Sequence, residues 1–123
     1  MALHIDQIRD YCLAKQQVTE SFPFDEDTLV FKVANKMFLL ISLKRWEQGD
    51  GFINLKCDPD WAQELRAEYE SIQPGYHMHK CLWNSVYAQT GKLSPQFVNE
   101  LIDHSYEQVV KSLPKKLRAT INL

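Results

Sequence analysis

The chain contains few cysteines, and their arrangement excludes a disulfide-stabilised fold. The three that occur, Cys12, Cys57 and Cys81, are odd in number, widely spaced and form no C-x-x-C pair. Disulfide frameworks use paired cysteines and belong to oxidising compartments. This pattern therefore indicates a reducing compartment, and we expect a cytoplasmic protein.

Long hydrophobic runs are also missing. No apolar stretch approaches the length of a membrane span, and the first six residues lack the basic and apolar regions of a signal peptide. Internal repeats and low-complexity segments are absent from the sequence as well. With 123 residues, the chain has the length of one domain, and we expect residues 1–123 to form a single soluble domain with no membrane partner.

The charge balance shows no excess of positive charge. Fourteen Lys and Arg residues face sixteen Asp and Glu residues, so the formal net charge is −2 and the isoelectric point is near 6.1. No global positive field draws the protein toward nucleic acid or an anionic membrane. Any polyanion would have to bind through a local arrangement of cations.

Hydrophobic periodicity predicts an α+β fold. Spacings of three and four predict helices over 3–16, from the Asp58-Pro59 cap to about Ser71, and after the Ser94-Pro95 cap, where Pro114 ends the helix. Alternation predicts strands over 18–24 (at a sheet edge), 28–33, 36–43, 52–57 and 82–87, with a long hairpin loop over 44–51 and a basic turn or short helix at the C-terminus. We expect a two-layer sandwich in which an antiparallel meander sheet carries helices on one face.

Strict alternation also predicts which side chains reach the uncovered sheet face. It places Met37, Leu39, Ile41 and Leu43 on one face of their strand and Lys36, Phe38, Leu40 and Ser42 on the other. On the same principle, the polar members of the neighbouring strands gather on the open face. These are Lys32, Ser42, Asn54 and Lys56.

The stretch from Pro74 to Trp83 has the highest density of potentially functional side chains in the chain. It holds two histidines, a lysine, a thiol, a tyrosine and a tryptophan within ten residues. If it continues into the last strand in extended form, alternate side chains share one face. These are His77, His79, Cys81, Trp83, Ser85 and Tyr87.

Three functional interpretations of this surface remain open beside a purely structural one. Lysines could neutralise phosphates while Trp83, Tyr76 or His77 stack on or hydrogen-bond to a nucleic acid. His77, His79 and Cys81 could bind a metal, although no fourth ligand with standard spacing is visible. Cys81 or Cys57 could act as a nucleophile near a histidine, although nothing marks either thiol as activated. Histidines and tryptophans beside a strand more often serve packing alone.

Several short segments, spread in order along the chain, resemble the MmcQ/YjbR family of small bacterial proteins. The matching segments are Ser21-Phe22-Pro23-Phe24, Lys36-Met37-Phe38, Asn54-Leu55-Lys56-Cys57-Asp58-Pro59, Gly75-Tyr76-His77-Met78, Trp83-Asn84 and Asp103-His104-Ser105-Tyr106. The resemblance implies a CyaY-like fold with paired hairpin wings and, from that double-wing shape, DNA binding. Family members often carry Asn at the position of His79, so a metal site would be particular to this chain.

Taken together, these observations predict a non-enzymatic protein that binds DNA through the open sheet face and hairpin wings. We expect a monomer without a catalytic residue, metal or cofactor. The alternative is a protein-interaction, small-ligand or metal-binding module on the same surface. Strand alternation and the family resemblance together predict a set of nucleic-acid contacts. These are Lys32, Lys36, Lys56, His77, Lys80, Trp83 and Asn84.

Overall fold

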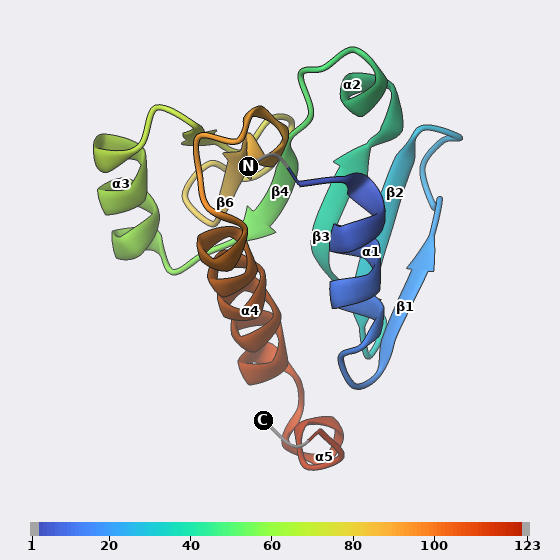
Figure 1. Cartoon of the computed structure of the whole chain (residues 1–123). Helices are drawn as coiled ribbons and strands as arrows, with labels where there is room; N and C mark the ends of the chain where they lie inside the picture. Colours follow the sequence, from blue (N-terminus) through green and yellow to red (C-terminus); the bar gives the residue numbers. More distant parts are fainter. Residues whose placement is uncertain (1–2, 122–123) are drawn as a thin grey trace.

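A computed structural model, which describes residues 3–121, shows an antiparallel sheet with helices on one face (Figure 1). The sheet has six strands in the order β1-β2-β3-β4-β6-β5. In chain order they are β1 (Val18–Ser21), β2 (Thr28–Val33), β3 (Lys36–Ser42), β4 (Ile53–Lys56), β5 (Ile72–Pro74) and β6 (Trp83–Val86). The predicted α+β class is confirmed, and β1 is an edge strand as expected.

Three longer helices in the described part of the chain pack on the same side of the sheet. They are α1 (Ile5–Leu13), α3 (Pro59–Glu68) and α4 (Pro95–Ser112). The predicted caps are present, because the side chains of Asp58 and Ser94 accept hydrogen bonds from the backbone N–H groups of Trp61 and Phe97. The short elements are α2 (Leu43–Glu47), the 3₁₀ turn η1 (Ala88–Thr90) and α5 (Lys115–Arg118). None of the described helices is long and apolar enough to cross a membrane.

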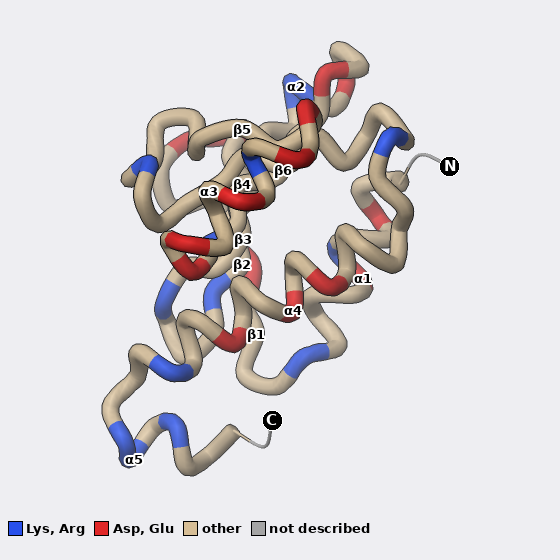
Figure 2. Tube along the Cα trace, turned by 90° about the vertical axis from the view of Figure 1, so that its left-hand side faces the viewer, with Lys and Arg blue, Asp and Glu red and all other residues tan. Residues whose placement is uncertain are grey.

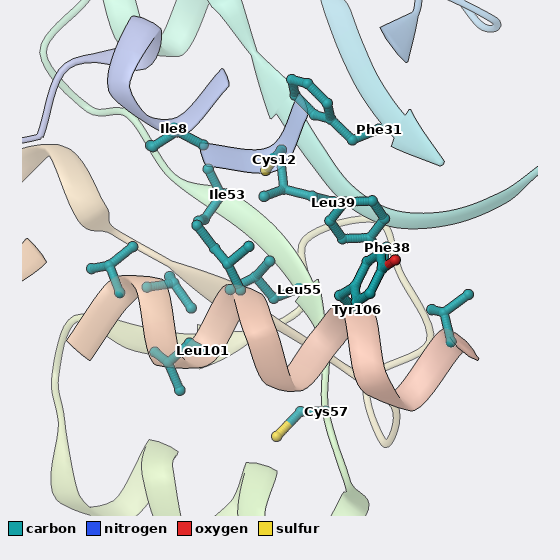
Figure 3. Packing of buried hydrophobic residues seen from close by; sticks show 14 of the residues in the cluster. Ile8, Cys12, Phe31, Phe38, Leu39, Ile53, Leu55, Cys57, Leu101 and Tyr106 are labelled. Carbon is teal, nitrogen blue, oxygen red and sulfur yellow. The ribbon is translucent and has the colours of Figure 1, made fainter. Parts of the chain in front are cut away.

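The main core lies between the sheet and these helices (Figure 3). Ile8 and Cys12 of α1 and Leu101 of α4 meet strand residues such as Ile53 and Leu55, and all five are almost fully buried. Burying apolar side chains of this size contributes about 1.5–3 kcal/mol each. The helix-covered face is therefore the structural face, and a ligand site has to be sought elsewhere.

A β-bulge in β3 overturns the strict alternation predicted for that strand. Phe31 pairs with Leu39 but Lys32 pairs with Met37, so Phe38 is the extra residue. Phe38 and Leu39 therefore both lie in the helix-side core. Met37 instead packs with Leu40 on the opposite side of the sheet, where it was not expected.

Two elements beside the open face, α2 and β5, were not predicted from the sequence. The expected hairpin loop over 44–51 begins with helix α2, whose N-cap is Ser42. The helix expected to reach about Ser71 ends at Glu68. Strand β5 begins at Ile72 and pairs with β6. Both elements border the open face of the sheet and help to shape it.

Candidate functional site

The open face of the sheet carries a small apolar cluster of its own. Val30, Leu40 and Trp83 are buried there and pack with Met37 and Met78. Trp83 is only 8% exposed because the loop 75–82 folds back over the sheet. Its predicted role as an exposed stacking platform is therefore wrong for this conformation, since its ring serves packing.

The loop 75–82 is a compact turn and does not continue the predicted strand 82–87 in extended form. The strand begins only at Trp83, and His77 adopts a left-handed backbone with φ 57°. Because the segment is not extended, His77, His79 and Cys81 do not share a strand face. Among the described residues, no group of three potential metal ligands lies close enough together to hold an ion.

Hydrogen bonds fix this loop to the sheet. The backbone N–H of Tyr76 donates to Ser85 Oγ at 2.9 Å, and Asn54 Nδ2 donates to the Tyr76 carbonyl at 3.1 Å. Ser85 Oγ in turn donates to Asn54 Oδ1 at 2.5 Å. Because Asn54 and Ser85 face each other on β4 and β6, the loop is held against a fixed platform.

Two basic side chains, Lys80 of the loop and Arg66 of α3, hold the loop in its folded shape. The ammonium group of Lys80 donates to the Gly75 carbonyl at 2.7 Å, and Arg66 Nη2 of α3 donates to the Lys80 carbonyl at 2.8 Å. Lys80, predicted to contact phosphate, therefore already has an acceptor in its own loop. Its first role here is to stabilise the turn.

A hollow of about 530 Å³ opens on this face of the sheet. Thr28, Leu40 and Asn54, from three adjacent strands, belong to its floor, and its lining is mostly apolar. The loop between β1 and β2 supplies Phe24, while the loop after β5 supplies Tyr76, His77, Met78 and His79. Because these loops come from opposite sides of the sheet, the hollow lies between two walls.

Each wall of the hollow presents an exposed aromatic ring. Phe24 is 62% exposed and Tyr76 is 47% exposed, although both are large apolar side chains. Behind Tyr76 lies the buried ring of Phe52, in an edge-to-face contact with a centroid distance of 5.8 Å. Exposed aromatic rings that border a concave apolar surface are typical of a binding site.

Arg45 of α2 supplies a fixed positive charge to the hollow. Its guanidinium carbon lies 5.4 Å from the centroid of Phe52 and 5.2 Å from that of Tyr76. Its Nη1 donates to Asp50 Oδ2 at 2.7 Å, and this hydrogen bond raises the pKa of Arg45 above its ordinary value. The cation is therefore held against two rings that line the hollow.

Asp27 ties the Phe24 loop to α2. One of its carboxylate oxygens accepts a hydrogen bond from the Ser42 hydroxyl at 2.6 Å, and the other accepts one from the Lys44 backbone N–H at 2.7 Å. The acidic segment 25–27 thus fixes one wall of the hollow.

The structure does not bring the seven predicted nucleic-acid contacts together. His77 alone of the seven lines the hollow among the described residues. Lys32 and Lys56 pair with Met37 and Trp83, which places them on the open face as expected. Lys36 is exposed next to the tight turn at 34–35, where its cross-strand partner is the core residue Val33.

Asn84 lies on the other side of the sheet from Trp83. It is 2% exposed and borders a small cavity of about 10 Å³ beside Cys57, Leu65 and His104. Consecutive strand residues point to opposite faces, so Trp83 and Asn84 could not both belong to one surface. Among the described residues, no partner forms a hydrogen bond with the Asn84 amide.

Charges of both signs are interspersed along the chain trace (Figure 2). Basic residues gather at the C-terminal helix α5, which contains Lys115, Lys116 and Arg118. This cluster follows the end of α4 and contributes nothing to the lining of the hollow. The hollow itself has Arg45 and Asp27 as its permanently charged lining residues in the described part of the chain.

The segment Asp103-His104-Ser105-Tyr106, part of the family resemblance, is structural in this fold. Asp103 accepts hydrogen bonds from the Tyr11 hydroxyl and pairs with Lys15, which ties α4 to α1. Ser105 Oγ donates to the carbonyl of the bulge residue Phe38 at 2.5 Å and accepts from the Lys56 N–H at 2.8 Å. The segment therefore stabilises the bulge that shapes the open face.

His104 joins α4 to the start of α3. Its Nε2 accepts a hydrogen bond from the backbone N–H of Asp58 at 3.1 Å, and its ring meets Trp61 edge to face at 4.5 Å. Burial lowers the pKa of His104, which keeps the imidazole neutral and able to accept. Its role is to hold the two helices together.

The raised pKa values of the buried cysteines predict how the free energy of unfolding depends on pH in the alkaline range. Burial raises the pKa values of Cys12 and Cys57 to about 12 each, whereas Cys81 is exposed. An unfolded thiol titrates near about 8.5, so above that pH the unfolded state binds fewer protons than the native state. We expect the free energy of unfolding to fall as pH rises above about 9.

Urea unfolding under reducing conditions between pH 7 and pH 10.5 measures this slope. Cys57→Ala should reduce the slope, because the variant removes one of the groups whose pKa differs between the two states. Cys81→Ser is the control and should leave it unchanged. A slope that responds equally to both replacements would contradict the assignment.

Comparisons with known proteins agree with this architecture. The family model described as YjbR matches residues 13–108. The chain belongs to the YjbR family. It is 41% identical over 95 residues to the Escherichia coli O157:H7 protein named "Uncharacterized protein YbdF", covering 77% of this chain and 75% of that protein. It is 31% identical over 114 residues to YjbR of Escherichia coli K12, covering 93% of each chain.

Two crystal structures share the YjbR fold of this chain. The Deinococcus radiodurans protein DR2400 superimposes with a TM-score of 0.85 at 34% identity, covering 94% of this chain and 86% of that one. A Pseudomonas syringae protein gives a TM-score of 0.73 at 26% identity, covering 86% and 98%. The YjbR match includes the whole sheet, both walls of the hollow and the Asp103–Tyr106 segment, and it ends before α5.

Proposed function

We propose that this YjbR-family protein is a non-enzymatic binding protein and that the hollow on the open sheet face is its ligand site. The observation that carries the proposal is the combination of the 530 Å³ volume with the exposed rings of Phe24 and Tyr76. Small-molecule sites typically measure about 300–1,000 Å³ and are lined by apolar and aromatic side chains with a few polar groups.

The hydrogen bonds around the hollow support a preformed site. Asn54 and Ser85 hold the loop at Tyr76, while Asp27 holds the opposite loop to α2. In a preformed site, less of the binding free energy is lost to ordering the side chains of the site. Met37 and Met78 add flexible apolar surface that adapts to the shape of a ligand.

The two buried thiols are not suited to covalent catalysis in the hollow. The nucleophilic form of cysteine is the thiolate, and burial raises the pKa values of Cys12 and Cys57 to about 12. Both thiols lie in the helix-side core, on the opposite side of the sheet from the hollow. Neither is placed to attack a ligand bound there.

Binding of an uncharged fluorescent probe, N-phenyl-1-naphthylamine, tests this proposal. We expect a saturable rise in its fluorescence with the native protein. Phe24→Ala should lower the affinity for the probe about three- to tenfold, since an aromatic contact contributes about 0.5–1.5 kcal/mol. Competition between the probe and a library of small molecules would then search for the natural ligand.

Phe22→Ala is the matched control. Phe22 is 46% exposed on the same loop, two residues from Phe24, but it does not line the hollow. Its replacement should leave probe affinity unchanged. Absence of saturable binding, or an equal effect of both replacements, would refute the hollow as the ligand site.

DNA binding is the second candidate, and one observation favours it. Lys32 and Lys56 project from the same sheet face as the hollow, as a phosphate-binding surface requires. Fluorescence anisotropy with duplex and single-stranded oligonucleotides at low salt tests it. Each lost phosphate contact should reduce the slope of log affinity against log salt by about 0.9 for duplex DNA. No binding near ~10⁻⁴ M would exclude this candidate.

A further inference from the structure

We infer that the hollow takes a small planar aromatic anion, with its ring between Phe24 and Tyr76 and its negative group on Arg45. This inference rests on the proposed function, because it specifies the chemistry of the ligand for the same site. Three features carry it: the arrangement of the rings, the accessibility of the Arg45 charge and the position of Asp27.

The rings define a place for a flat group. Phe24 and Tyr76 stand on opposite walls, and much of each ring is exposed. Aromatic pairs favour stacked or edge-to-face contact at centroid distances of about 4.5–7 Å. A planar ligand in the hollow would cover both rings, whereas a purely aliphatic ligand would gain no such contact geometry.

The charge of Arg45 is available to a ligand. Asp50 contacts one terminal nitrogen, and its own side chain is 55% exposed. Such solvent-exposed ion pairs contribute about 0–1 kcal/mol, so exchange of Asp50 for a ligand anion costs little. The guanidinium fork binds carboxylate, sulfonate or phosphate oxygens with two parallel hydrogen bonds. Stacking on Phe52 and Tyr76 already orients that fork.

The carboxylate of Asp27 limits how much negative charge a ligand in the hollow can carry. Both of its oxygens accept hydrogen bonds from α2 and its cap, so the carboxylate is fixed in place. It repels any negative charge beyond the one that Arg45 can pair with. The adjacent Asp25 and Glu26 extend this repulsion, which favours a small ligand with one anionic group over a long polyanion.

Two probes with the same ring system test the inference. 8-Anilinonaphthalene-1-sulfonate and N-phenyl-1-naphthylamine both carry an anilinonaphthalene core, but only the first is an anion. We expect the native protein to bind the sulfonate about three- to tenfold more tightly, the range of a charge-assisted contact in a partly exposed site. Arg45→Gln should remove this preference, so that the sulfonate binds no more tightly than the uncharged probe. Arg45→Lys, which keeps the charge but loses the fork, should give an intermediate preference.

The outcomes separate this inference from the proposed function. The aromatic-anion inference would be overturned by equal affinity of the two probes for the native protein, or by an equal loss of affinity for both probes in Arg45→Gln. The hollow would then remain an apolar site. Failure of both probes to bind would refute the proposed function as well. Circular dichroism and thermal unfolding of each variant verify that it is folded.

Competition experiments distinguish two sources of the same chemistry. 1-Naphthoate represents a free aromatic carboxylate, and adenosine monophosphate represents a nucleotide, with adenosine as its uncharged control. Displacement of the sulfonate probe by only one of the two anions assigns that source. If neither anion displaces the probe at millimolar concentration, the inference is wrong.

Discussion

Replacing Ser105 with alanine is expected to lower the free energy of unfolding by about 2–4 kcal/mol, because two buried backbone groups lose their partner at once. Ser105 is fully buried in α4, and its hydroxyl bridges the Phe38 carbonyl and the Lys56 N–H. Alanine has no polar atom that could replace it, and a buried polar group without a hydrogen bond costs about 1–3 kcal/mol. Equilibrium unfolding in urea measures the difference.

Ser112→Ala is the matched control for this replacement. Ser112 also belongs to α4 and also donates to a carbonyl, that of Val109, but it is exposed at the end of the helix. Water can satisfy the Val109 carbonyl there, so the cost should stay below about 1 kcal/mol. Equal costs at the two positions would mean that Ser105 does not hold the bulge.

Gly75→Ala is expected to destabilise the protein by about 1–3 kcal/mol and to weaken probe binding in the hollow. A Cβ atom at position 75 would lie 2.8 Å from Trp83 Cβ and 2.9 Å from the Trp83 carbonyl oxygen, both closer than unstrained contacts. The neighbouring strand atoms belong to the sheet and cannot move far, so the loop has to move. Because Tyr76 and His77 follow directly, a displaced loop changes one wall of the hollow.

Gly49→Ala separates the two effects. Gly49 adopts a left-handed backbone with φ 80°, and a Cβ there would meet nothing within 4 Å. Alanine should cost about 1 kcal/mol through backbone strain alone. Affinity for N-phenyl-1-naphthylamine should therefore remain unchanged in Gly49→Ala and fall in Gly75→Ala. Unchanged affinity in both variants would show that the position of the 75–82 loop does not shape the hollow.

Most of the fold was predictable because its signals are local. The Asp58-Pro59 and Ser94-Pro95 caps begin their helices as predicted, since a capping side chain acts within its own first turn. The two residues between the predicted strands 28–33 and 36–43, Ala34 and Asn35, form a tight turn with positive φ at both. The edge position of β1 also agrees with the proline that follows it.

The candidate site was predicted less well because it depends on long-range contacts. The Phe38 bulge is stabilised by Ser105, which lies 67 residues further along the chain, so alternation within β3 gave no sign of it. The exposed rings of Phe24 and Tyr76 belong to segments that carry the family resemblance. Tyr76 was considered as a stacking residue, but neither ring is among the seven predicted contacts. Arg45 was placed in a loop, because helix α2 depends on the carboxylate of Asp27 as well as on its own cap.

The sequence by itself determined the class of the fold and the face of the sheet that helices cover, because apolar periodicity and caps act over a few neighbouring residues. The family was indicated by the resemblance of short segments along the chain. Tertiary structure alone decided that Trp83 is buried, that His77 turns away from an extended path and that Arg45 reaches the hollow. The physical reason is that a bulge and a folded-back loop are held by hydrogen bonds between residues far apart in the chain, and such bonds leave no periodic trace in the sequence.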